Sequence, residues 1–178
     1  AAIDAVNAAG GGLVLLSEGT FVIDTPMATK TGVVLAGMGK GSTIIQLEAG
    51  MGVSLTSILE ATTQSNIGIQ DLTIDGNKAA QAGAFQFPGI VFDAVTNAVI
   101  RDVIVKNLYD DAESEASIEI KGGASSGCVI ERCGIFDCES LWNVEITGGS
   151  GHVVTENRIV RDVTTNIDSI LCGASSCK

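Results

Sequence analysis

Two glutamates occupy equivalent places in a short motif that recurs along the chain. The motif reads Ser-Ile-Glu-Ile at 117–120 and Asn-Val-Glu-Ile at 143–146, so Glu119 and Glu145 are 26 residues apart. If each copy is one strand of a stacked repeat, the two strands lie about 4.8 Å apart and both carboxylates stand on the same outer face. Such a pair can share a Ca²⁺ or act as acid and base in glycoside cleavage, where retaining enzymes hold carboxyls about 5 Å apart. A solvated pair without a chemical role is the alternative.

A second acidic group lies in the segment Leu-Tyr-Asp-Asp-Ala-Glu-Ser-Glu at 108–115. Its carboxylates either bind a cation or simply solubilise a turn. Asp111, together with Glu119 and Glu145, is the candidate calcium site. Apart from Ca²⁺, the sequence indicates no cofactor.

The only histidine, His152, is expected to have a structural role. It aligns with Ile67, Ala98 and Cys128 at the start of a repeated strand, where a side chain becomes partly buried. A buried histidine is therefore favoured over a general base. No spacing of cysteine and histidine matches a zinc site.

The five cysteines do not form an obvious disulfide framework. Cys128, Cys133 and Cys138 are five residues apart, and an extended chain separates such positions by about 16 Å, too far for a disulfide. We expect them to be small buried hydrophobic residues. Only Cys172 and Cys177 could close a loop near the end of the chain.

The elements that must position these groups form a repeat. Four ten-residue segments align, and they begin at Asn66, Asn97, Gly127 and Gly151, with spacings of 31, 30 and 24 residues. Together with the shorter Glu-containing motif, they make two strand motifs at one shared period, which is typical of a solenoid. An antiparallel sandwich also has short alternating strands, but it does not require a fixed period.

The aligned positions predict which side chains face the core, because strand residues alternate between two faces. Three columns are expected to point inward: Ile69, Ile100, Ile130 and Val154; Ile74, Val105, Ile135 and Ile159; and Leu72, Val103, Cys133 and Asn157. The last of these, Asn157, would need a hydrogen-bond partner for its buried amide. One column is expected to point outward: Thr73, Ile104, Gly134 and Arg158.

The first part of the chain predicts how the stack begins. An alanine-rich run at 1–9 reads as a short helix that the glycines at 10–12 terminate. Strands are expected at 13–16, 20–23, 32–35 and 43–47. A helix before the first coil would cover strand edges that otherwise pair with other chains. The predicted organisation is one β-helix domain over residues 1–178, with a capping helix at 1–10, about seven coils within 13–172 and a tail at 173–178.

Composition narrows the range of functions. Hydrophobic residues make up 46% of the chain and aromatic residues only 4%, which suits a narrow aliphatic core. No apolar run approaches the roughly 18 residues of a membrane span. The net charge of −11 argues against nucleic acid as a partner. The same charge disfavours an anionic polysaccharide unless a divalent cation bridges the two.

Four segments carry a family resemblance: 2–12, 17–22, 35–45 and 71–77. They resemble the right-handed parallel β-helix proteins of the pectate-lyase-like superfamily, and especially the opening of mannuronan C5-epimerase modules and of phage tailspike β-helices. The resemblance implies an all-β, right-handed parallel β-helix with a short N-terminal helix. It covers about residues 1–77 and indicates the fold rather than the function, because this fold carries many activities.

The resemblance also implies a site with a tyrosine, an aspartate and a histidine on one strand. Here the nearest place has Tyr109 and Asp110 but no histidine. Tyr109 and Asp110 therefore join Glu119 and Glu145 as catalytic candidates. Epimerase or β-elimination chemistry is in doubt, because both need a base that removes the C5 proton.

Two interpretations of function follow. The first is an extracellular β-helix that binds or processes a polysaccharide as a lyase, epimerase or glycoside hydrolase. The second is a non-catalytic structural β-solenoid of a phage tailspike, sheath or surface fibre, which associates end to end or as a trimer. The expected location is extracellular, on a cell surface or on a virion. The superfamily favours the first interpretation, whereas the missing base and the scarcity of outward aromatic residues favour the second.

Overall fold

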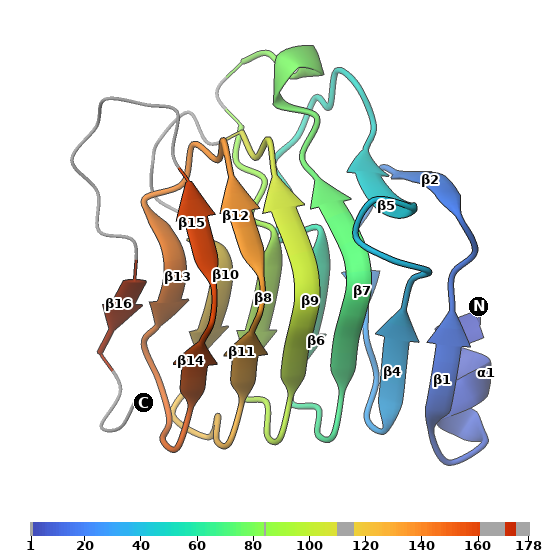
Figure 1. Ribbon diagram of the computed structural model, residues 1–178, viewed down its shortest axis with the longest axis vertical. Helices are drawn as coiled ribbons and strands as arrows, with labels where there is room; N and C mark the ends of the chain where they lie inside the picture. The colour runs from blue at the N-terminus through green and yellow to red at the C-terminus, as the bar shows by residue number, and fades with distance from the viewer. Residues whose placement is uncertain (1, 84, 110–115, 161–169, 174–178) are drawn as a thin grey trace.

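The computed structural model describes residues 2–83, 85–109, 116–160 and 170–173. The chain winds as a right-handed parallel β-helix, in which each strand pairs in parallel with the strand one coil away (Figure 1). This confirms the predicted fold class. The right-handed sense is the usual one for strands joined by crossover connections.

Two sheets run along the β-helix. Sheet A has six strands in one line, in the order β1 (Gly12–Leu15), β4 (Val33–Ala36), β7 (Gly68–Asp75), β9 (Val99–Lys106), β11 (Val129–Glu131) and β14 (Val153–Thr155). Beside this line sheet A includes β2 (Gly19–Ile23), β5 (Thr43–Leu47), β12 (Gly134–Phe136) and β15 (Arg158–Val160). Sheet B has the order β3 (Met27–Ala28), β6 (Leu59–Thr62), β8 (Ile90–Asp93), β10 (Ala116–Lys121), β13 (Trp142–Ile146) and β16 (Ile170–Cys172).

The described residues make about five turns, so the predicted seven coils were too many. The reason is the length of individual coils. Paired residues are 21 apart where Gly12 meets Val33, but 34 apart where Val34 meets Gly68. Longer loops between the strands use up residues without adding turns, including the one that carries the 3₁₀ helix η1 (Lys78–Ala80).

The inward columns are confirmed by both register and burial. Ile69, Ile100 and Ile130 pair in line and are at most 1% exposed, and Val154 continues the line with partial burial. The second column pairs in the same way: Ile74, Val105, Ile135 and Ile159. Each aliphatic side chain packs on its counterpart one coil away, so the core is a set of continuous stacks.

A kink within sheet A explains why positions three apart, such as 69 and 72, both face the core. The residue at the kink adopts a left-handed conformation in four successive coils: Asp71, Asp102, Arg132 and Glu156, with φ between 51° and 57°. One such residue changes the strand direction and resets the alternation of faces. Only the two aspartates belong to a type that favours this conformation.

Asn157 obtains the partners that its inward position requires. Its Oδ1 accepts from the Cys133 backbone N–H at 2.8 Å, and its Nδ2 donates to the Ile130 carbonyl at 2.9 Å. The amide therefore replaces a core aliphatic without leaving an unsatisfied polar atom.

Thr73 departs from the expectation for an outward residue. It pairs with Ile44 and Ile104 in the outward register, yet it is only 3% exposed. The loop between β4 and β5 lies over it, and the Thr73 hydroxyl donates to the Lys40 carbonyl. A long connection thus buries part of the outer face of sheet A.

The N-terminal helix is present as predicted. α1 (Ala2–Ala8) lies against β1 at one end of the β-helix (Figure 1), and Ile3 and Val6 pack against the core. The four strands expected in the first part of the chain form within one residue of their predicted bounds. Among the described residues, no helix is long and apolar enough to cross a membrane.

Candidate functional site

The two stacked glutamates lie side by side on the outer face of sheet B. Glu119 on β10 pairs with Glu145 on β13, as the repeat predicted. Glu119 is only 8% exposed, and its Oε2 lies 2.8 Å from Lys121 Nζ. Glu145 is half-buried. Glu119 is therefore ion-paired with a lysine of its own strand, a partner that the sequence interpretation did not include.

A groove of about 330 Å³ lies on the same face of sheet B. Its lining combines apolar, hydroxyl and charged side chains: Leu55, Thr56, Glu60, Thr62, Pro88, Val91, Asp93 and Lys121. Glu60 accepts hydrogen bonds from Thr56 Oγ1 at 2.8 Å and from Ser57 Oγ at 3.3 Å. The charged groups in the lining of this groove are the carboxylates of Glu60 and Asp93 and the ammonium group of Lys121.

The other predicted site residues do not join this pair within the described structure. The Tyr109 hydroxyl donates to the Gly83 carbonyl at 2.6 Å, and its ring centroid lies 6.4 Å from that of Phe87. Asp110 and Asp111 lie outside the described residues. Within the described ranges, no three His, Cys, Asp or Glu side chains gather as a metal site, so the calcium site stays a prediction.

His152 is a buried structural residue, as expected, with 1% of its surface exposed. Its Nδ1 accepts from the Cys128 backbone N–H at 3.3 Å, and its Nε2 lies 3.1 Å from the Gly148 carbonyl. Both ring nitrogens are thus occupied by the backbone, which leaves neither free for proton transfer.

The central cysteines are free and buried, as predicted. Burial raises the pKa of Cys133 and of Cys138 to about 11, so both stay protonated and unreactive near neutral pH. Cys172 is disulfide-bonded. Its predicted partner, Cys177, lies outside the described residues.

A second groove of about 330 Å³ lies on the outer face of sheet A. It is lined by charged and apolar residues and by one glycine: Lys40, Asp102, Ile104, Arg132, Cys133, Gly134, Phe136, Glu156 and Arg158. Its three cations outnumber its two carboxylates. The chain is strongly acidic overall, so charge is divided unequally between the two faces.

The floor of this groove is an aromatic platform that Gly134 makes room for. A Cβ at Gly134 would come within 2.5 Å of the Phe136 ring, so only glycine lets the ring lie over β12. The Arg158 guanidinium carbon sits 5.8 Å from the centroid of that ring. Among the described residues Arg158 forms no ion pair, which leaves its donors available to a ligand.

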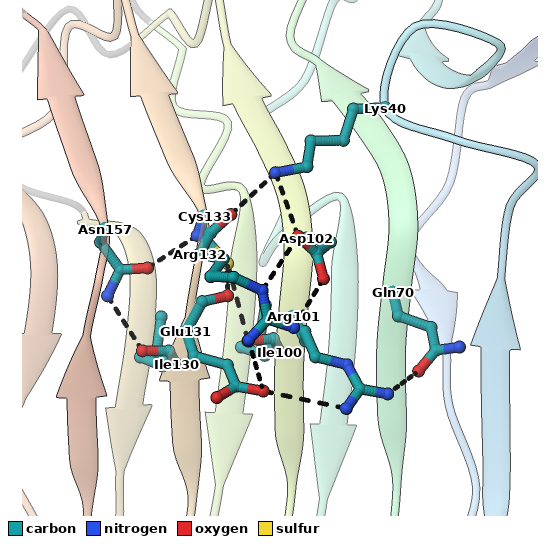
Figure 2. A network of polar contacts seen from close by, with 10 residues as sticks. All are labelled: Lys40, Gln70, Ile100, Arg101, Asp102, Ile130, Glu131, Arg132, Cys133 and Asn157. Carbon is teal, nitrogen blue, oxygen red and sulfur yellow. Dashed lines mark hydrogen bonds and ion pairs between the residues drawn. The ribbon is translucent and has the colours of Figure 1, made fainter.

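A network of ion pairs and hydrogen bonds borders the groove and extends across four successive coils (Figure 2). Asp102 holds Arg132 at 2.8 Å and Lys40 at 3.3 Å, and Lys40 also donates to the Arg132 carbonyl at 2.9 Å. Hydrogen bonds from Arg132 and then Lys40 keep the pKa of Asp102 below its usual value. Arg101 continues the network from Glu131 to Gln70, where its guanidinium donates to the Gln70 side chain at 2.8 Å.

The sequence interpretation did not identify this groove. It placed Arg158 and Gly134 in the outward column but gave neither a function, and it counted few outward aromatic residues. The detectable signal was Phe136, two residues after Gly134 and therefore on the same face of the strand. The contribution of Lys40 was not predictable, because it comes from a loop 92 residues away from Arg132 in sequence.

Comparison with known proteins agrees with this architecture. A stretch covering 44% of this chain is 40% identical to mannuronan C5-epimerase AlgE6 of Azotobacter vinelandii, of which it covers 10%. The A-module of AlgE6 has a TM-score of 0.64 at 22% identity, over 89% of this chain and 51% of that one. A candidate glycosyl hydrolase of Parabacteroides merdae reaches 0.76 at 16% identity, over 99% of this chain and 84% of that one. No protein-family model matches the chain.

The chain is a parallel β-helix, and its N-terminal part resembles the mannuronan C5-epimerases. The predicted resemblance is therefore confirmed. This β-helix spans only a small part of the matched curated relative, so the activity of that protein does not transfer to it directly.

Proposed function

We propose that this β-helix binds a polysaccharide outside the cell through the outer face of sheet A, as a part of a carbohydrate-processing protein. The observation that carries the proposal is the platform of Phe136 over Gly134 with Arg158 above the ring. Flat apolar ring faces suit an aromatic surface, and a guanidinium recognises carboxylates through two parallel donors.

The charge of this groove supports an acidic glycan as the ligand. Lys40, Arg132 and Arg158 lie along it against two carboxylates. The overall charge of −11 disfavoured such a ligand in the sequence interpretation, but a ligand at the groove interacts mainly with charges within a Debye length of about 8–10 Å. Sheet A can therefore accept an anionic chain without a bridging cation.

Affinity electrophoresis tests the proposal with the described β-helix in gels that contain mannuronan, polygalacturonate or neutral dextran. We expect retardation by an acidic glycan, and we expect Arg158→Ala and Phe136→Ala each to weaken it at least about tenfold, as loss of an aromatic or arginine anchor does. Lys121→Ala, on sheet B, is the matched control and should bind like the wild type. If none of these glycans retards the wild-type protein, the structural β-solenoid becomes the better interpretation.

A further inference from the structure

A row of outward apolar side chains crosses sheet A and is interrupted at one position. Successive strands contribute Leu13, Val34, Gly68, Val99, Val129 and Val153, which pair in register from β1 to β14. Gly68 is the only member without a side chain. Its φ is not in the left-handed region, so the backbone does not require glycine there.

The missing side chain leaves a hollow of about 290 Å³. Val34 and Val99 form its walls on the neighbouring strands, and Gly68 its floor. A Cβ at Gly68 would lie 3.1 Å from Val34 Cγ1 and 3.2 Å from Val34 Cγ2, so any side chain there would have to displace Val34 and change the shape of the hollow.

Polar groups surround this apolar floor on two sides. Asn66 and Asn97 stand at one border, where Asn97 Nδ2 donates to Asn66 Oδ1 at 3.3 Å. Gln70 and Arg101 stand at the other, joined through Gln70 Oε1 at 2.8 Å. Within the described structure, Gln70 Nε2 and Asn66 Nδ2 donate to no protein acceptor. An apolar floor with free amide donors on both sides suits a ring that has one apolar face and hydroxyls at its edge.

We infer that the hollow at Gly68 is a second saccharide-binding position, which takes one pyranose unit of the chain whose other part lies in the groove at Phe136. The inference rests on the proposed function. Both positions lie on the outer face of sheet A. Arg101 lines the hollow, Arg132 lines the groove, and Glu131 forms ion pairs with both arginines (Figure 2). The two positions are separated by two strands and about five residues, or roughly 15–20 Å.

This separation predicts a dependence on ligand length. A pyranose unit extends on the order of 5 Å, given bond lengths near 1.5 Å. A disaccharide therefore reaches one position at a time, whereas a hexasaccharide reaches both. Occupying two linked positions increases affinity without any change in either contact.

Calorimetry with mannuronan disaccharide and hexasaccharide tests the inference. If affinity electrophoresis shows binding to polygalacturonate and not to mannuronan, the disaccharide and hexasaccharide of galacturonate are used instead. Gly68→Val completes the apolar row and fills the hollow. We expect it to lower hexasaccharide affinity about tenfold or more and to leave disaccharide affinity unchanged. Phe136→Ala should weaken both ligands, and Val153→Ala, in the same row but away from the hollow, should weaken neither.

Two further measurements keep the outcomes distinct. Gln70→Met removes the amide donors without adding bulk at Gly68, so it should also weaken the hexasaccharide alone, even if Gly68→Val folds poorly. Equal hexasaccharide affinity in Gln70→Met, Gly68→Val and the wild type overturns the second position while leaving the groove at Phe136 intact. Failure of the wild type to bind either ligand overturns the groove and the hollow together.

Discussion

The outer faces of sheets A and B rest on one core but carry opposite chemistry. On sheet A, cations and an aromatic ring border a groove, and each carboxylate of the network there contacts two cations. On sheet B, Glu119 pairs with Glu145 and forms an ion pair with Lys121, and Glu60 and Asp93 line a groove together with Lys121. Beneath both faces the inward positions are aliphatic and buried.

The difference shows how a stacked fold separates stability from function. An inward side chain packs on its counterpart in the next coil, so neighbouring coils must match at that position. An outward side chain also has a counterpart in the next coil, but solvent beside it relaxes the packing requirement, so its identity can change from coil to coil. The net charge of the whole chain consequently says little about either face, because the two faces divide the charged residues unequally.

Core truncations should have the largest effect, and an equal one beneath the two faces. Ile130 on sheet A and Ile118 on sheet B are both fully buried. Replacing either by alanine should lower the free energy of unfolding by about 2–5 kcal/mol, as loss of a buried isoleucine does. Urea unfolding measures this, with Val129→Ala, a half-buried outward substitution, as the control. A much smaller loss at Ile118 would mean that the two faces do not share one core.

The threonine under the β4–β5 loop should have an intermediate effect. Thr73→Ala removes the hydroxyl that donates to the buried side of that loop, and should cost about 1 kcal/mol, the usual net value of such a hydrogen bond. Thr62, an exposed outward residue of β6, is the matched position on sheet B, and Thr62→Ala should change stability by less than about 0.5 kcal/mol. If urea unfolding gives the same loss of stability for Thr73→Ala and Thr62→Ala, the hydrogen bond from Thr73 to the loop does not stabilise sheet A.

The ion pairs of Asp102 should make a small, pH-dependent contribution to the free energy of unfolding. The folded-state pKa of Asp102 is lowered, first by the hydrogen bond from Arg132, so its contribution is present above the ordinary aspartate pKa near 4 and is lost as pH falls below it. Because these side chains are partly exposed, we expect only a few tenths of a kcal/mol, about the value of a surface ion pair. Urea midpoints at pH 7 and pH 3 should therefore differ slightly more for the wild type than for Asp102→Asn. An identical pH response in the variant would contradict this.

The glutamates of sheet B should have the smallest effect on glycan binding. Glu145→Gln lies on the face opposite the proposed groove, so electrophoretic retardation should equal that of the wild type. The sequence prediction of an acid–base pair is tested in the same protein by any assay that detects glycan turnover. If Glu145→Gln lowers the rate of glycan turnover by at least about a hundredfold, the size of a missing general acid or base, the functional face is on sheet B and not on sheet A.

Much of the fold was predictable because its signal is repeated. Ile100 and Ile130 align at a spacing of 30 residues and are indeed neighbours in one stack. The left-handed kink was not predicted, since Arg132 and Glu156 do not belong to a residue type that favours it. The number of turns was overestimated because loop length varies from coil to coil.

The candidate site was only partly predictable. The register of Glu119 with Glu145 was correct, because both belong to the repeat. The ion pair that neutralises Glu119 was not foreseen, although Lys121 is two residues away on the same strand face. The assignment of Glu119, Glu145, Tyr109 and Asp110 as catalytic residues stays a prediction.

The sequence by itself determined which side chains stack inside this β-helix, because packing against an identical neighbour repeats at a readable period. Only the tertiary structure decided what the outer faces present. Lys40 reaches Asp102 and Arg132 from a loop several coils earlier, and the Phe136 ring occupies space that a side chain at position 134 would otherwise fill. Such contacts depend on where loops cross the surface and on the shape of adjacent strands, and neither leaves a periodic signal in the chain.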